Sequence, residues 1–117
     1  MKHDAVTVER FYTDQSGALG LKLIAGAGGL KRVIHEPTIN RPGLALSGFF
    51  QYFAHRRIQV VGLAEHTYLQ SLPPAVRTKN LRDVFKRRIP CVVCSRNKAI
   101  SEEMRKIDDA LRIVFSL

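Results

Sequence analysis

Residues 39–44 of this 117-residue chain read INRPGL, and residues 48–53 read GFFQYF. Arg41 precedes a proline and is pushed out of the helical region, whereas Pro42 has its φ fixed near the helical value and suits the first position of a helix. We therefore expect an extended segment through Ile39 that breaks into a helix near Pro42. Apolar side chains recur in that helix at i, i+3, i+4 and i+7, which predicts one buried stripe of Leu46, Phe49, Phe50 and Phe53.

Two polar residues lie at this helix entrance, Asn40 and Arg41. Asn40 is a turn residue whose side chain can bond to nearby backbone. Polar side chains on connecting segments are often the ones that contact a ligand or a partner. Asn40 and Arg41 are therefore candidate contact residues, and a phosphorylated or nucleotide-like effector is one ligand class to consider.

The second half of the sequence alternates strands and helices. Apolar patterns predict a strand at 58–61, a helix at 64–72 with Ala64, Tyr68, Leu69 and Leu72 inside, and a further helix that opens at Pro74. The continuous apolar run 91–94 is typical of a parallel strand buried on both faces. Ser101 is the expected N-cap of a last helix, whose inner face is Met104, Ile107 and Leu111, and residues 113–115 are a final strand. This alternation predicts an α/β fold with a mixed, mostly parallel sheet.

The helices and strands predicted for the first half of the sequence are short. Thr7 is the expected N-cap of a helix that closes near Gly17. Alternating leucines at 19, 21 and 23 predict a strand, and the glycine-rich turn 26–29 leads to a second strand at 31–35. We therefore expect a hairpin here.

The length suits a single domain over residues 1–117. The hydrophobic fraction of 45% and the charged fraction of 25% are those of an ordinary globular protein. No apolar run approaches the roughly 20 residues of a membrane helix, and the first residues lead into no secretory signal. A cytoplasmic protein with no membrane association is the expectation.

The formal net charge of +9 raises the expectation of an anionic partner. Six basic residues lie around the helix that precedes Cys91, and we name them as a candidate basic face: Arg77, Lys79, Arg82, Lys86, Arg87 and Arg88. A solvated or interdomain face explains them most simply. Nucleic-acid binding is the sharper alternative, although single-strand binders interleave exposed aromatic residues with the charge, and the aromatic residues here lie elsewhere.

The sequence offers no recognisable reactive centre. Cys91 and Cys94 form a lone C-x-x-C on a predicted strand, where their sulfurs point to opposite faces, and no second ligand pair accompanies them. The glycine-rich segment 26–31 does not match the G-x-x-x-x-G-K-[ST] spacing of a phosphate-binding loop. Glu65 and His66 are adjacent on a predicted helix, so their side chains diverge. We therefore expect no catalytic residue, cofactor site or metal site within this chain.

Three further segments join the opening stretch in one family resemblance. Residues 57–62 read RIQVVG, Glu65 is followed by YLQSL at 68–72, and residues 89–93 read IPCVV. With 39–53, these segments resemble the N-terminal domain of HPr kinase/phosphorylase, a bacterial carbon-regulation enzyme. Two departures are visible, since Gln51 stands where an acidic residue is common and Leu63–Ala64 replaces a basic–hydroxyl pair.

The resemblance implies a parent enzyme that phosphorylates a serine of HPr and removes that phosphate, with ATP and magnesium held by a C-terminal P-loop kinase domain that is absent from this chain. It also implies a hexamer and a layered α/β/α fold similar to the N-terminal domain of muramyl-peptide ligases. The family's catalytic residues have no matching positions here. The first hypothesis is therefore a non-catalytic regulatory or assembly domain, and the alternative is a basic nucleic-acid-binding α/β module.

Overall fold

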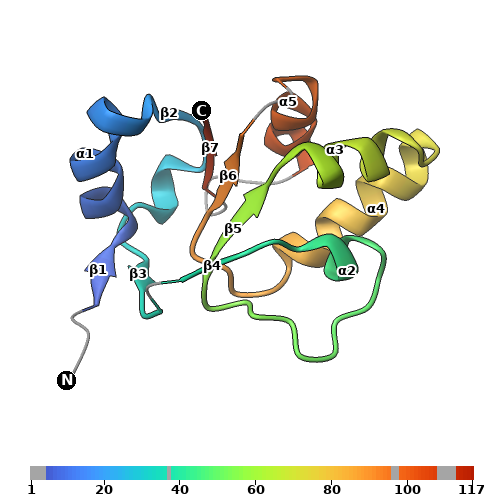
Figure 1. Ribbon diagram of the computed structural model, residues 1–117, viewed down its shortest axis with the longest axis horizontal. Coiled ribbons are helices and arrows are strands. Elements are labelled where there is room, and N and C mark those ends of the chain that lie inside the picture. The colour runs from blue at the N-terminus through green and yellow to red at the C-terminus, as the bar shows by residue number, and fades with distance from the viewer. Residues whose placement is uncertain (1–4, 37, 96–97, 108–112) are drawn as a thin grey trace.

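A computed structural model describes residues 5–36, 38–95, 98–107 and 113–117. Its centre is a five-stranded mixed sheet in the order β2-β7-β6-β5-β4, in which β2 is antiparallel to β7 and all other neighbours are parallel (Figure 1). The strands are β2 (Lys22–Ala25), β4 (Ile39–Asn40), β5 (Ile58–Val61), β6 (Val92–Cys94) and β7 (Val114–Ser116). The prediction of an α/β fold with a mostly parallel sheet is therefore confirmed.

The predicted alternation of the second half is also confirmed. β5 is followed by α3 (Leu63–Gln70) and α4 (Pro74–Phe85), and β6 is followed by α5 (Lys98–Ile107). Because each step moves to the next strand of the sheet in the same direction, right-handed crossovers place all these helices on one face. The helix α1 (Val8–Leu19) lies on the other face (Figure 1). The result is a layered α/β/α arrangement, whose likeness to the muramyl-peptide ligases stays a prediction.

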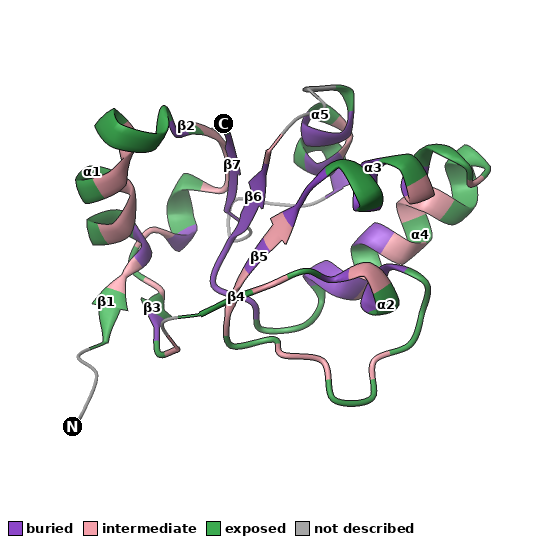
Figure 2. Cartoon of the chain, in the orientation of Figure 1, coloured by how far each residue is buried: buried purple, intermediate pink, exposed green. Residues whose placement is uncertain are grey.

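Two hydrophobic clusters fill the layers. Leu46, Leu69, Leu81, Phe85 and Met104 pack with the sheet residues Val61, Val92, Cys94 and Val114 on one face. The cluster on the opposite face joins Val8 to Cys91, Val93 and Phe115, and Tyr12 stacks on Phe115 at 5.0 Å between ring centroids. Alternate residues of 91–94 thus enter opposite clusters, which confirms the prediction of a strand buried on both faces and of diverging sulfurs. Figure 2 shows β6 and β7 buried along their length.

The predicted N-terminal hairpin is wrong. The cap at Thr7 is confirmed, because its hydroxyl accepts a hydrogen bond from the Arg10 N–H. The helix α1 runs past Gly17 and ends at Leu19, followed by Gly20 as the C-cap with φ +69°. β2 pairs with β7 at the far end of the sequence, whereas β3 (Val33–Ile34) pairs with β1 (Val6–Thr7) in a separate two-stranded sheet. The connecting glycines form a 3₁₀ turn, η1 (Ala27–Gly29). The alternating leucines indicated a strand but carried no information about its partner.

The helix predicted after Pro42 is a single turn, α2 (Gly43–Leu46). It ends because Gly48 adopts φ +96°, a left-handed conformation that terminates helices. The predicted aromatic stripe therefore does not form. Phe49 is 49% exposed, whereas Phe50 and Phe53 reach the first hydrophobic cluster from an irregular loop.

Two helix details also differ from the prediction. In α3 the buried positions are Glu65, His66 and Leu69, and Ala64 is exposed. Ser101 is not an N-cap but a buried residue inside α5, which begins at Lys98. Leu111, predicted for the inner face of that helix, lies outside the described residues. None of the helices in the described parts of the chain has the length and apolar character needed to cross a bilayer.

Candidate functional site

Asn40 ends the edge strand β4 and is bound to its neighbouring strand. Its Nδ2 donates to Oε1 of Gln59 at 2.7 Å. Gln59 is fully buried, and its Nε2 donates to the carbonyl oxygens of Ala54 and Arg57, both at 2.9 Å. Asn40 therefore belongs to a network that holds the loop before β5 against the sheet.

Arg41 reaches from the end of β4 to the first turn of α3. Its Nη2 and Nε lie 2.6 and 3.2 Å from Oε1 of Glu65, and the same oxygen accepts the Gly62 N–H at 2.8 Å. The Glu65 side chain is 7% exposed and that of Arg41 is 51% exposed. Burial by itself would raise the pKa of Glu65, but hydrogen bonds from Arg41 and Gly62 outweigh it and lower the pKa. The guanidinium is thus already engaged with a carboxylate.

Gly62 leaves room for this ion pair. A Cβ at position 62 would lie 2.6 Å from Nη2 of Arg41 and 3.4 Å from Oγ of Ser95. Arg41, Gly62 and Ser95 each follow one of three adjacent parallel strands, so they meet at the carboxyl edge of the sheet. Ligands of open α/β sheets bind at the carboxyl ends of the strands.

Beside Arg41 the chain presents apolar side chains to solvent. Tyr52 is 92% exposed, Leu44 is 68% exposed and Phe49 is 49% exposed, and all three line one shallow groove of about 110 Å³ with Asn40 and Arg41. We call Leu44, Phe49 and Tyr52 the 44–52 surface. Tyr52 also has φ +63°, a conformation that is strained for an aromatic residue. Figure 2 shows the loop after α2 as largely exposed.

The contacts described above come from residues 39–53, the segment whose sequence first suggested a family. The family model for the HPr serine kinase N terminus matches residues 6–115. The chain belongs to this family. Its relatives include the HPr kinase/phosphorylases of Clostridium acetobutylicum, 39% identical over 82 residues, and of Alkaliphilus metalliredigens, 35% identical over 100 residues. These matches cover 70% and 86% of this chain but only 26% and 31% of the relatives.

The candidate basic face of this HPr kinase N-terminal domain is not one array of solvated cations. Arg77 has a side chain that is only 15% exposed, and it donates to the Leu69 carbonyl at 2.8 Å and to Glu103 at 3.2 Å. Lys79 pairs with Asp83 one helical turn away, and the Arg87 guanidinium lies 4.0 Å from the centre of the Phe50 ring. Arg82, Lys86 and Arg88 are exposed. Nucleic-acid binding by this face stays a prediction from charge.

Burial shifts the pKa values of three side chains of this family member, Cys91, Cys94 and His66. Burial raises the pKa of Cys91 to about 12 and that of Cys94 to about 11, so both thiols are protonated at neutral pH. Burial lowers the pKa of His66, and the neighbouring Glu65 opposes this only in part. Sequence reasoning placed Glu65 and His66 on a helix but missed that Glu65 receives Arg41, because the two residues are 24 positions apart. The only signal was that Arg41 follows one predicted extended segment and that Glu65 lies at the start of the helix after the next predicted strand.

Proposed function

We propose that this chain is the non-catalytic regulatory and assembly domain of a bifunctional HPr serine kinase/phosphorylase, which controls carbon metabolism through the sugar phosphotransferase system. The family membership and the name of the relatives support the parent activity. Since the chain spans about a third or less of the length of those relatives, a separate P-loop kinase domain would hold ATP and magnesium and would act on HPr.

The residues that the structure describes form no recognisable catalytic site for ATP and magnesium, which supports the proposal that another domain of the parent carries out phosphoryl transfer. Magnesium is held by carboxylates together with substrate phosphates. Among the described residues, no group of three histidine, cysteine, aspartate or glutamate side chains could hold a metal ion. Glu65, the carboxylate at the carboxyl edge, already accepts hydrogen bonds from Arg41 and Gly62. The glycines at 27–29 form a 3₁₀ turn rather than a loop that leads into a helix, so they do not resemble a phosphate-binding loop.

The observation that carries the assembly role is the 44–52 surface. An exposed aromatic residue in a strained backbone conformation, with two exposed apolar neighbours, is typical of a protein interface. This surface lies beside the outer strand β4, within the segment that most resembles the family. We infer that the parent's own kinase domain covers it, and that further subunits join in a homo-oligomer that is a hexamer in the family.

The test is to mix this chain with a separately expressed kinase domain of HPr kinase/phosphorylase and to measure the mass of the complex by light scattering. The double variant Leu44→Lys, Tyr52→Lys should abolish the complex. A matched control places lysines at two exposed apolar positions elsewhere, Leu19→Lys and Val76→Lys, and should leave it intact. Equal loss of the complex in both double variants would refute this interface. ATP turnover by the isolated chain that a point mutation abolishes would refute the non-catalytic role.

A further inference from the structure

A pocket of about 420 Å³ lies at the amino ends of the parallel strands, away from the Arg41 edge. Its walls come from three places far apart in sequence: the strand β3 and its flanks, the loop that leads into β5, and the loop that leads into β6. Its volume falls within the roughly 300–1,000 Å³ that is typical of small-molecule sites. The pocket is formed entirely by tertiary structure, so no short motif marks it.

Among the residues that the structure describes, the titratable ones that line the pocket are all basic: Arg32, His35, Arg56 and Arg88. Neither Arg56 nor Arg88 has an ion-pair partner among the residues that the structure describes. The acid nearest in sequence to His35 is Glu36, and its carboxylate binds Arg57 at 3.0 Å. Guanidinium groups gathered around one hollow repel one another, and the entry of an anion relieves this repulsion at Arg56 and Arg88.

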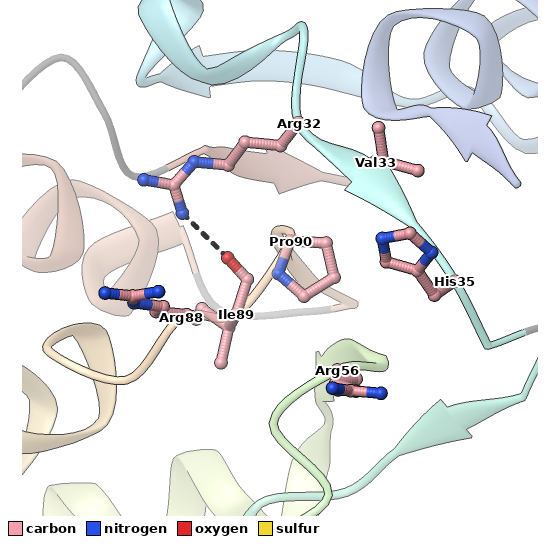
Figure 3. Close-up of a pocket in the computed structure, with 7 residues that line it drawn as sticks. All are labelled: Arg32, Val33, His35, Arg56, Arg88, Ile89 and Pro90. Carbon is pink, nitrogen blue, oxygen red and sulfur yellow. Dashed lines mark hydrogen bonds between the residues drawn. The ribbon is translucent and has the colours of Figure 1, made fainter.

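The pocket also has an apolar floor and a fixed donor. Ile89 and Pro90 are buried, and Val33 adds a third apolar wall. Nη1 of Arg32 donates to the Ile89 carbonyl at 2.9 Å, and this bond anchors the guanidinium beside the floor. Figure 3 shows the four basic side chains arranged around Ile89 and Pro90.

We propose that this pocket binds a small organic molecule that carries two or more phosphoryl groups. Arginine is suited to phosphate because its planar fork donates two parallel hydrogen bonds. Cations on several sides exceed what a single phosphate needs, so they suit a ligand with several charges. The floor formed by Val33, Ile89 and Pro90 accepts the organic body. This ligand site is separate from the 44–52 surface, so it stands or falls independently of the proposed assembly role.

The first experiment measures binding of three probes to the intact chain by calorimetry at low salt. ADP has both the phosphoryl groups and an organic moiety, inorganic pyrophosphate has the phosphoryl groups alone, and adenosine has the organic moiety alone. ADP should bind most tightly, pyrophosphate more weakly, and adenosine not at all. Binding of adenosine as tight as that of ADP, or no binding of either phosphate compound, would overturn the proposal.

The second experiment locates the site. The double variant Arg56→Gln, Arg88→Gln should weaken ADP binding about tenfold for each arginine removed. The double variant Arg105→Gln, Lys106→Gln removes the same charge from an exposed helix face and should bind ADP as tightly as the unsubstituted chain does. Equal weakening in both would show general attraction to a basic protein and would overturn the pocket.

A third measurement does not depend on any variant. In amide NMR spectra of the unsubstituted 117-residue chain, ADP should shift the signals of Val33, His35 and Ile89. Shifts concentrated at Gly62 and Ser95 would place the ligand at the carboxyl edge instead and would overturn this assignment. A short RNA that displaces ADP while shifting the signals of 77–88 would mean that the ligand is a nucleic-acid backbone, which also overturns it.

Discussion

Nη2 of Arg41 lies 2.6 Å from Oε1 of Glu65, and this contact joins the end of β4 to the first turn of α3. Arg41 is half exposed while the carboxylate is buried, so the two partners differ in what their loss would do. Loss of Arg41 would leave the buried carboxylate with backbone N–H donors, those of Gly62 and Glu65, but without the positive charge that faces it. The pair therefore acts as a tie between two segments of the family signature.

Glu65→Gln should destabilise the fold by about 1–3 kcal/mol, because the amide removes the charge that Arg41 and the Gly62 N–H address. Urea unfolding measures the free energy of unfolding. Glu102→Gln, at an exposed position of α5, is the control and should change this free energy by less than about 0.5 kcal/mol. Equal effects of the two substitutions would contradict the role given to the Arg41–Glu65 pair.

Gly62→Ala should also destabilise, by about 1–2 kcal/mol, because the new Cβ meets Nη2 of Arg41 and displaces it from Glu65. In an Arg41→Ala background the obstacle is gone, so Gly62→Ala should cost clearly less there. A double-mutant cycle read out by urea unfolding tests this coupling. Strict additivity of the two substitutions would show that Gly62 is needed for another reason.

The pH dependence of stability should carry the signature of His66. Its folded pKa lies below its ordinary value because of burial, so the unfolded chain binds the proton more readily. Stability is therefore full above the unfolded pKa, about 6.5, and falls as the pH drops through that value towards the folded pKa. Glu65, whose pKa is also lowered, adds a further loss only at more acidic pH, as its own carboxylate is protonated.

The measurement for His66 is the free energy of unfolding at several pH values between about 7 and 5. His66→Asn should flatten the slope in this window, whatever its effect on absolute stability. His55→Asn, which removes an exposed histidine, is the control. A slope that persists unchanged in His66→Asn would assign the pH dependence to other groups.

Tyr52→Gly should stabilise the isolated chain by about 0.5–1 kcal/mol. Glycine adopts φ +63° without steric cost, and a side chain that is 92% exposed gives up little burial. Tyr52→Ala keeps the strained conformation and should show no gain. Thermal unfolding compares the three proteins. A loss of stability in Tyr52→Gly would mean that the aromatic ring supports the fold itself rather than an interface.

Arg77→Gln should destabilise by about 1–2 kcal/mol, since Arg77 links the end of α3 to Glu103 of α5. Arg105→Gln on the exposed face should have little effect. Urea unfolding measures both. If Arg77→Gln left stability unchanged but weakened binding to RNA, the arginine would serve as a nucleic-acid contact. That result would support the alternative hypothesis of a nucleic-acid-binding module.

Local signals in the sequence determined much of this architecture. The Thr7 cap, the proline that opens α4 and the apolar run 91–94 each fix a nearby element by short-range chemistry, and their order along the chain specified a mostly parallel sheet. The family, too, followed from the residues themselves. In contrast, Gly48 was ambiguous, because a glycine inside an apolar pattern indicates either close packing or a helix end, and only its φ of +96° decided between them.

Tertiary structure decided everything that depends on which distant segments meet. The pairing of β2 with β7 replaced the expected hairpin because strand partners are chosen by the whole sheet and not by an alternating pattern. Arg41 found Glu65 only once successive strands aligned, and Arg56 came to lie near Arg88 because both precede adjacent parallel strands. The sequence alone thus determined the alternating strands and helices of the second half and the family. The Arg41–Glu65 contact and the basic pocket are formed by segments far apart in the sequence, and local conformational propensity does not determine which distant segments meet.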